Sequence, residues 1–319
     1  MKKGFLACLV LVLLSSVAFS QTFNYIKSID CSANGDYLTG CAFYSEAVYL
    51  VTFNDQKVLK VTDIDTATPT ITEIADLSGE VTWVAQRGLT GIDVDADAIY
   101  VTGDDGTGAF IYKLSHTGTV LDSFTDAVGD HRHGGLALWE SGNLLVTQTG
   151  SGMMKFKSDF SGYDGYKGGA DAYNRDVCVV GDDFYASHTN GGATDGITRY
   201  TGGTIGDVTS YTPSDWMDTG TGNWAAGCGI SYFVYMGMMS PVGYLCFGNR
   251  TTSEMELYDS TATKAYNLGT TDNVTDAIDS CAGSVNSAPY FFVTDGSANN
   301  LVVFGVDHTT VGDWTLYQR

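Results

Sequence analysis

Three arginines and two histidines are the residues of this sequence whose types and spacing best suit ligand binding. Arg87 and Arg132 each stand 15 residues before the end of a strand-like run, and Arg175 stands 12 residues before the end of the next one. Guanidinium groups pair well with carboxylates and phosphates. His131 and His133 flank Arg132, and two histidines in alternation on a strand share a face that a metal ion could use. The pattern predicts a polar site for an anionic ligand.

A simpler interpretation of the same residues stays open. Each arginine can pair with a nearby acid, such as Asp130 or Asp176, and then only closes a junction between structural units. The histidines can equally be hydrogen-bonded polar groups, because a metal site would need a further ligand from the same two acids. The sequence therefore leaves a ligand site and a structural role as alternatives.

The elements that must position these residues form a repeat. A β-rich run, a polar turn and a second β-rich run occur six times, and the first runs end at residues 52, 102, 147, 187, 247 and 294. A period of 40 to 60 residues carried by β-branched and aromatic side chains is typical of propeller blades. We therefore expect an all-β, six-bladed β-propeller with four antiparallel strands in each blade. The first strands would line a central channel and bring the arginines to one mouth.

The second and third repeats carry a resemblance to a known family. Residues 91–124 and 135–156 run as Gly-apolar-x-Val-Asp, a turn, apolar-Tyr-Val, a polar turn and an apolar strand, most clearly in the second repeat. This style resembles the blades of NHL and SMP-30/gluconolactonase-like proteins. The resemblance implies a six-bladed propeller without fixing an activity. A gluconolactonase-like enzyme would need a Glu, an Asn and an Asp around a metal ion, for which Glu46, Asn174 and Asp279 are available.

No cofactor is predicted, although a metal ion such as calcium in the channel is not excluded. The alternating acids Asp93, Asp95 and Asp97 look like the start of a calcium loop, but Ala98 stands where that loop needs glycine. We interpret them as a hairpin turn. The sequence has neither a Gly-x-Ser-x-Gly nor a His-Glu-x-x-His motif.

The ends and the overall charge suggest an exported protein. Residues 1–20 have two lysines before a long apolar run and are predicted to be a signal peptide. Residues 21–40 are expected to form an N-terminal strand and loop, and residues 41–319 the propeller. The net charge of −21 argues against nucleic acid and membrane surfaces as partners. Other proteins, extracellular glycans or further copies of the chain are the expected partners.

Six cysteines remain beyond the leader, and an even count in an exported chain suggests disulfides. Cys31 and Cys41 flank a turn-rich loop, and Cys228 and Cys246 are spaced as in a long hairpin, so these two bridges are predicted. The pairing of Cys178 and Cys281 stays open, and free thiols are an alternative. Asn249 and Asn273 begin glycosylation sequons in predicted loops.

One strand-like segment, residues 23–29, has no place in six blades that use residues 41–318. It could close the ring on the last blade or pair with another molecule. The function predicted from these features is a secreted, non-catalytic binding or assembly module. The alternative is an enzyme at the channel mouth, a lactonase-like or sialidase-like hydrolase, that acts on an anionic or sugar-derived substrate.

Overall fold

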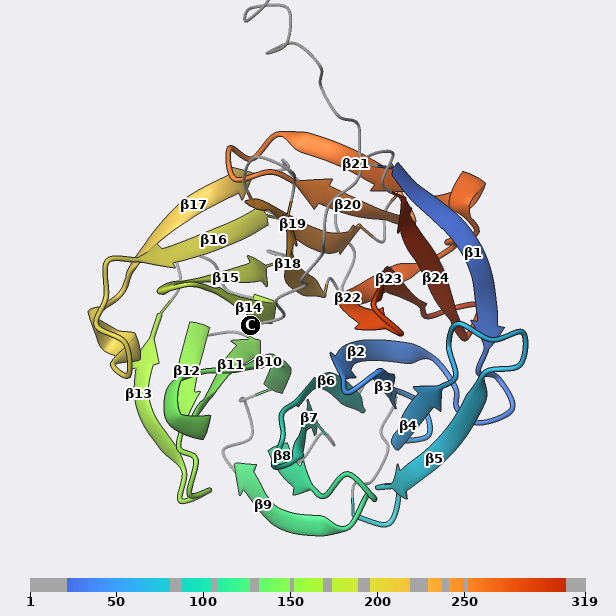
Figure 1. Cartoon of the computed structure of the whole chain (residues 1–319). Helices are drawn as coiled ribbons and strands as arrows, with labels where there is room; N and C mark the ends of the chain where they lie inside the picture. The colour runs from blue at the N-terminus through green and yellow to red at the C-terminus, as the bar shows by residue number, and fades with distance from the viewer. Residues whose placement is uncertain are drawn as a thin grey trace, which may run out of the picture.

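The computed structural model shows six four-stranded antiparallel sheets arranged as the blades of a propeller around a central channel (Figure 1). It describes residues 22–80, 88–104, 108–126, 132–149, 152–168, 174–188, 196–218, 229–236, 241–249 and 252–307. Three short 3-10 turns are the helical elements of this part: η1 (Glu140–Gly142), η2 (Val208–Ser210) and η3 (Thr270–Asp272). The predicted all-β, six-bladed architecture is confirmed.

The first three blades follow the chain from the channel outward. Blade 1 contains β2 (Leu38–Tyr44), β3 (Ala47–Thr52), β4 (Lys57–Thr62) and β5 (Thr70–Asp76). Blade 2 contains β6 (Leu89–Val94), β7 (Ile99–Asp104), β8 (Ala109–Leu114) and β9 (Val120–Asp126). Blade 3 contains β10 (Arg132–Leu138), β11 (Leu144–Thr149), β12 (Gly152–Phe156) and β13 (Tyr163–Lys167).

The next two blades repeat this order, and the sixth does not. Blade 4 contains β14 (Asn174–Val180), β15 (Asp183–His188), β16 (Gly196–Thr201) and β17 (Thr212–Asp218). Blade 5 contains β18 (Ile230–Met236), β19 (Pro241–Asn249), β20 (Glu254–Tyr258) and β21 (Lys264–Leu268). Blade 6 contains β22 (Ala277–Val285), β23 (Ala288–Asp295), β24 (Asn300–Asp307) and, as its outer strand, β1 (Thr22–Asp30).

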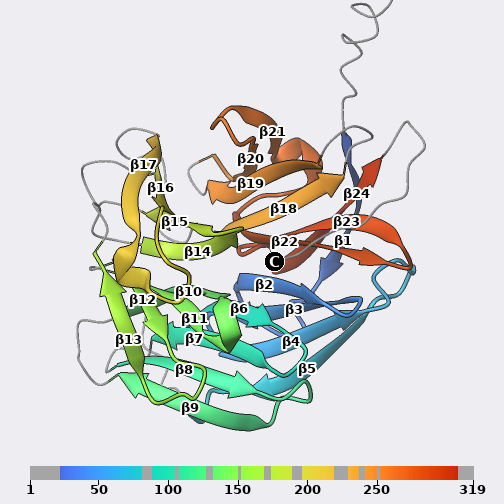
Figure 2. The same cartoon turned by 60° about the vertical axis from the view of Figure 1, so that its left-hand side comes forward.

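The N-terminal strand is therefore not a spare element. β1 pairs antiparallel with β24 from Thr22 opposite Asp307 to Asp30 opposite Asn300, and the two lie side by side in Figures 1 and 2. The expectation that the C-terminal residues would complete the last blade is wrong for its fourth strand, because β1 already occupies that edge of β24. Residues 308–319 lie outside the described part. The ends of the described chain are thus joined in one sheet, which closes the ring.

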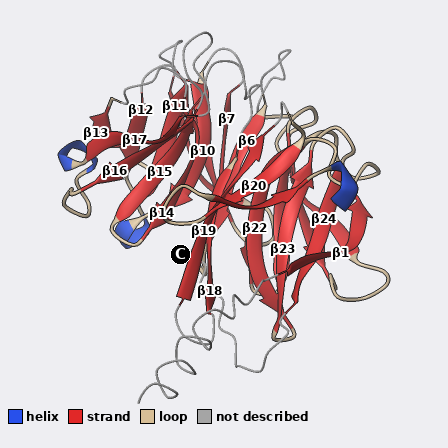
Figure 3. Ribbon diagram, turned by 90° about the horizontal axis from the view of Figure 1, so that it is seen from above, coloured by secondary structure: helices blue, strands red, loops and turns tan. Residues whose placement is uncertain are grey.

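The core is divided among the blade junctions. The described structure has one buried apolar cluster between each pair of neighbouring blades. All six residues of β3, and all six of β7, are buried, because each of these strands is covered on both faces by adjacent blades. The outer strands are mostly exposed, as in β9. Figure 3 shows that most of the described secondary structure is strand. Among the described residues, no helix is long and apolar enough to span a membrane.

Candidate functional site

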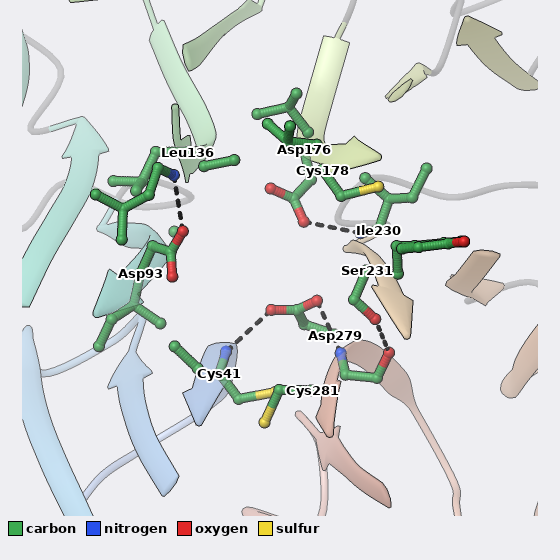
Figure 4. A pocket seen from close by; sticks show the side chains of 18 of the residues that line it. Cys41, Asp93, Leu136, Asp176, Cys178, Ile230, Ser231, Asp279 and Cys281 are labelled. Atoms are coloured by element: carbon green, nitrogen blue, oxygen red, sulfur yellow. Dashed lines mark hydrogen bonds between the residues drawn. The ribbon is translucent and has the colours of Figure 1, made fainter. Parts of the chain in front are cut away.

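The inner strands β2, β6, β10, β14, β18 and β22 surround a cavity of about 90 Å³ on the propeller axis. Three aspartates on alternate blades, Asp93, Asp176 and Asp279, point into it (Figure 4). The rest of the lining consists mainly of apolar and thiol side chains. A space of this size holds a few water molecules and is well below the volume of ordinary small-molecule pockets.

Each aspartate also ties its blade to the next one. The carboxylate oxygens accept backbone N–H groups from the following inner strand: Asp93 from Leu138 (2.7 Å), Asp176 from Ile230 (2.8 Å) and Asp279 from Cys41 (2.9 Å). Backbone groups on inner strands lack a sheet partner on the channel side, so these bonds satisfy them. The aspartates are structural bridges between blades as well as the polar lining of the cavity.

Glycines make room for two of these carboxylates. A Cβ atom on Gly135 would lie 1.5 Å from Asp176 Oδ1, and one on Gly229 would lie 2.4 Å from Asp279 Oδ1. Both distances are far below any real van der Waals contact. A side chain at either glycine would displace the carboxylate, so the close approach of the inner strands depends on these two residues.

Burial makes the cavity carboxylates weak acids. It raises the pKa of Asp93 to about 6 and the pKa of Asp279 to about 7, although each group accepts two backbone N–H groups that act in the opposite direction. Burial and the charge of Asp279 raise the pKa of Asp176 well above its usual value. Three like charges around one small space disfavour full ionisation. The cavity therefore holds protons near neutral pH and suits water or a small cation better than an anion.

The arginine site expected from the sequence would lie at the mouth, by which we mean the face where the inner strands begin. Arg132 opens β10 and Arg175 is the second residue of β14, on the neighbouring blade. The two strand starts are close, because Thr147 Oγ1 on blade 3 donates to Arg175 O at 3.1 Å. Arg175 is partly buried. Arg87, His131 and the side chain of Arg132 lie outside the described part, so a shared site for the three arginines stays a prediction.

His133 lies between blades 2 and 3, away from the cavity lining. Its Nδ1 is 3.2 Å from the carbonyl oxygen of Phe110, which can only accept, so Nδ1 carries the proton. Nε2 then accepts from the hydroxyl of Tyr163. Burial raises the pKa of Tyr163, which keeps that donor protonated. Phe110 and Tyr163 hold the His133 ring within the blade junction.

Two buried amides near the mouth were not singled out together by the sequence. Asn174 begins β14 and Gln148 lies opposite His133 on β11, and each side chain is 1% exposed. Both amide atoms of Asn174 and the Nε2 of Gln148 have no hydrogen-bond partner among the described residues. Buried polar groups are nearly always satisfied, so such groups call for a ligand or a bound water. The sequence offered one signal, an amide residue at the end of a strand-like run. Only the fold shows which of the polar strand residues are buried.

The lactonase-like combination of residues is not assembled. Asn174 is at the mouth and Asp279 lines the cavity, whereas Glu46 is exposed on the hairpin after β2, at the opposite end of the inner strands. The described residues contain no group of three or more His, Cys, Asp or Glu side chains arranged to hold a metal ion. Asp95 Oδ1 accepts the N–H groups of Asp97 and Ala98, which is the hairpin turn predicted for this acidic segment.

The predicted bridge between Cys31 and Cys41 is not formed. Both are buried free thiols, and Cys31 Sγ donates to the carbonyl of Ile29 at 3.6 Å. Cys41 instead contacts Cys281. Cys246 is also a buried free thiol, and its predicted partner Cys228 lies outside the described part.

The two sequons differ in their surroundings. Asn249 ends β19 rather than lying in a loop, and its buried side chain bonds Glu256 and the N–H of Thr252. The prediction of a loop at Asn249 is therefore wrong. Asn273 lies in an exposed turn after η3 with a left-handed backbone, as expected for a loop residue.

Comparison by sequence finds no relatives: no protein-family model and no curated protein matches the chain. Solved structures do match over most of their length. The PQQ-bound form of the aldose sugar dehydrogenase from Streptomyces coelicolor has a TM-score of 0.63 at 11% identity, covering 90% of this chain and 99% of that one. The soluble aldose sugar dehydrogenase from Escherichia coli, in its apo form, has a TM-score of 0.59 at 12% identity, covering 94% and 100%.

A putative oxidoreductase (glucose dehydrogenase) from Thermus thermophilus is also similar, with a TM-score of 0.60 at 12% identity and coverage of 88% and 99%. Such low identity shows a shared fold alone. These neighbours are sugar dehydrogenases rather than NHL or SMP-30 proteins, so the resemblance in repeat style holds only for the six-bladed architecture. Two of these neighbours are aldose sugar dehydrogenases and the third is a putative oxidoreductase, which counts against the prediction of a non-catalytic binding or assembly module and favours the enzyme alternative.

Proposed function

We propose that this protein is an enzyme that oxidises a sugar or a sugar-derived alcohol at the mouth of the propeller. The observation that carries the proposal is the pair of buried, unsatisfied amides at Asn174 and Gln148. Amides both donate and accept hydrogen bonds, which suits the hydroxyl groups of a sugar. The full-length likeness to three sugar oxidoreductases supports the same reaction class.

The structural neighbour from Streptomyces carries PQQ, a tricyclic quinone with three carboxylates. The central cavity does not fit this group, because about 90 Å³ is far too small for it and no cationic side chain among the described residues lines the cavity. The donors near the mouth would suit it better, since Arg132 starts β10 and Arg175 is the second residue of the neighbouring inner strand β14. Guanidinium groups at that position would hold the carboxylates.

When bound, PQQ would supply the two-electron acceptor for oxidation of the substrate alcohol. The residues of this chain would do the binding: Arg175 and, by its place in the sequence, Arg132 would face the anionic cofactor. Asn174 and Gln148 would orient the substrate hydroxyls through their amide groups. His133 is not assigned as a base, because Phe110 and Tyr163 engage its two ring nitrogens.

Reduction of an artificial electron-accepting dye tests the proposal. The purified protein is incubated with PQQ, with and without Ca²⁺, and assayed against a panel of aldoses. We expect sugar-dependent dye reduction that requires PQQ, and a loss of at least about tenfold in kcat/KM for Asn174→Ala, the worth of one hydrogen bond to a substrate. The control Asn267→Ala changes an exposed amide on outer strand β21 and should have no effect.

PQQ binding is measured separately by titration. Arg175→Ala should weaken it about tenfold or more through the loss of a charge-assisted hydrogen bond. Arg199→Ala is the matched control, because Arg199 pairs with Asp183 on the flank of blade 4. A protein that binds no PQQ and oxidises no aldose would refute the proposed function.

A further inference from the structure

Two thiols face each other across the junction between the last blade and the first. Cys41 lies on β2 and Cys281 on β22, the inner strands of blades 1 and 6. The two side chains are 5% and 4% exposed and belong to one buried cluster. β2 and β22 belong to different sheets and share no ladder of backbone hydrogen bonds.

The geometry of the junction brings the sulfur atoms together. Asp279 Oδ2 accepts the N–H of Cys41 at 2.9 Å, which fixes β22 against β2 at this point. Asp279 and Cys281 are two residues apart on one strand, so their side chains share the face toward β2. The thiols of Cys41 and Cys281 are in hydrogen-bonding contact, and Figure 4 shows the two sulfur atoms beside each other.

We propose that Cys41 and Cys281 form a disulfide bond that locks the first blade to the last when the protein folds in an oxidising environment. Each thiol loses a proton, one sulfur–sulfur bond forms, and two electrons pass to a small disulfide such as oxidised glutathione, which becomes two thiols. The sequence predicted Cys31 as the disulfide partner of Cys41, because a short turn-rich loop separates them. Closure of the ring instead places Cys281 in contact with Cys41.

The order of events follows from burial. Thiolates are the reactive species in disulfide exchange, and burial together with the neighbouring Cys281 thiol raises the pKa of Cys41 well above its usual value. The finished protein therefore reacts slowly, and the bond forms while blades 1 and 6 are still coming together. Cys178 lines the same cavity but belongs to a different cluster, between blades 4 and 5, so it serves as the control thiol.

Peptide mapping without reduction tests the pairing directly. The chain is folded with a glutathione redox mixture, free thiols are alkylated in denaturant, and the protein is cut before aspartates. This separates Cys31 in residues 30–35 from Cys41 in residues 36–54 and Cys281 in residues 279–294. We expect the last two peptides to be joined, with a mass two hydrogen atoms below their sum. Alkylated Cys41 and Cys281, or a bond from Cys31 to either of them, would overturn the proposal.

Thermal melting gives a second, independent measurement. A bond that encloses most of the chain should raise Tm by roughly 10 °C, and reductant should remove that gain. Cys281→Ser should melt at the same temperature with and without reductant, whereas Cys178→Ser should keep the difference. If the wild-type Tm is the same with and without reductant after the protein has been unfolded and refolded, the bond is absent. This holds whatever Tm values the variants show.

Discussion

Closure of the ring by β1 predicts a large cost for removing Phe23, the apolar residue near the start of that strand. Phe23 is 9% exposed and makes edge contacts with three rings, with centroid distances of 5.9 Å to Phe233, 5.0 Å to Tyr266 and 5.6 Å to Phe291. Phe233 and Tyr266 belong to blade 5, so Phe23 packs the closing strand against the neighbouring blade. Removing the Phe23 ring therefore tests the packing that closes the ring, and not only the pairing within the sheet of blade 6.

Truncating a buried phenylalanine to alanine costs about 3–5 kcal/mol. The remaining exposure and the position near the strand end favour the lower figure, and about 3 kcal/mol corresponds to a fall in Tm of roughly 6–10 °C. Scanning calorimetry or near-ultraviolet circular dichroism measures this. The control is Ile26→Ala on the same strand, where Ile26 is 47% exposed and the change should stay within about 0.5 kcal/mol.

Equal Tm values for Phe23→Ala and Ile26→Ala would refute the closure of the ring by β1. The measurement should be repeated over a range of protein concentrations, because pairing of β1 with β24 of the same chain gives a Tm independent of concentration. A Tm that rises with concentration would show that β1 is exchanged between molecules.

Two further predictions concern the cavity. The folded-state pKa of Asp279, about 7, lies above an unfolded value of about 3.9, so the native state binds more protons between these pH values. The free energy of unfolding should therefore fall as pH rises from about 4 to 7, by up to about 4 kcal/mol, and level off above. Urea titrations should show a flatter profile for Asp279→Asn, and parallel profiles would contradict the argument. Gly135→Ala should cost about 2 kcal/mol or more by displacing Asp176, while Gly79→Ala, with open space around it, should be near neutral.

The six blades were predictable because each repeat carries its own pattern. A run such as Ile99–Thr102 is apolar at every position but its last, which indicates a strand covered on both faces, and six such runs at similar spacing define a ring. The fourth strand of blade 6 was predicted only as one of two alternatives for residues 23–29, closure of the ring or pairing with another molecule. β1 lies outside the repeat, and its partner β24 is about 270 residues away, so nothing local in residues 22–30 specifies the pairing.

The site was predictable in part. Arg132 is the first residue of β10 and Arg175 the second residue of β14, near the strand starts that the repeat positions imply, while a shared arginine site stays a prediction. The three cavity aspartates were not recognised as a group, because Asp93 looked like part of an acidic turn and Asp176 like a partner for an arginine. Their convergence depends on ring closure, which places residues from three separate repeats on one axis. A single acid within an otherwise apolar inner strand, as at Ile92-Asp93-Val94, was the local signal.

The pairing of β1 with β24 also has a consequence for how the chain is made. Among the described strands β1 is synthesised first, and its partner β24 follows about 270 residues later. At 5–20 residues per second, the ribosome needs roughly 15–50 s to cover that distance. Through this interval blades 1 to 5 can fold one after another, while β1 has no sheet to join. The ring therefore closes only after β24 has been translated, and an earlier arrest leaves β1 without the strand it pairs with.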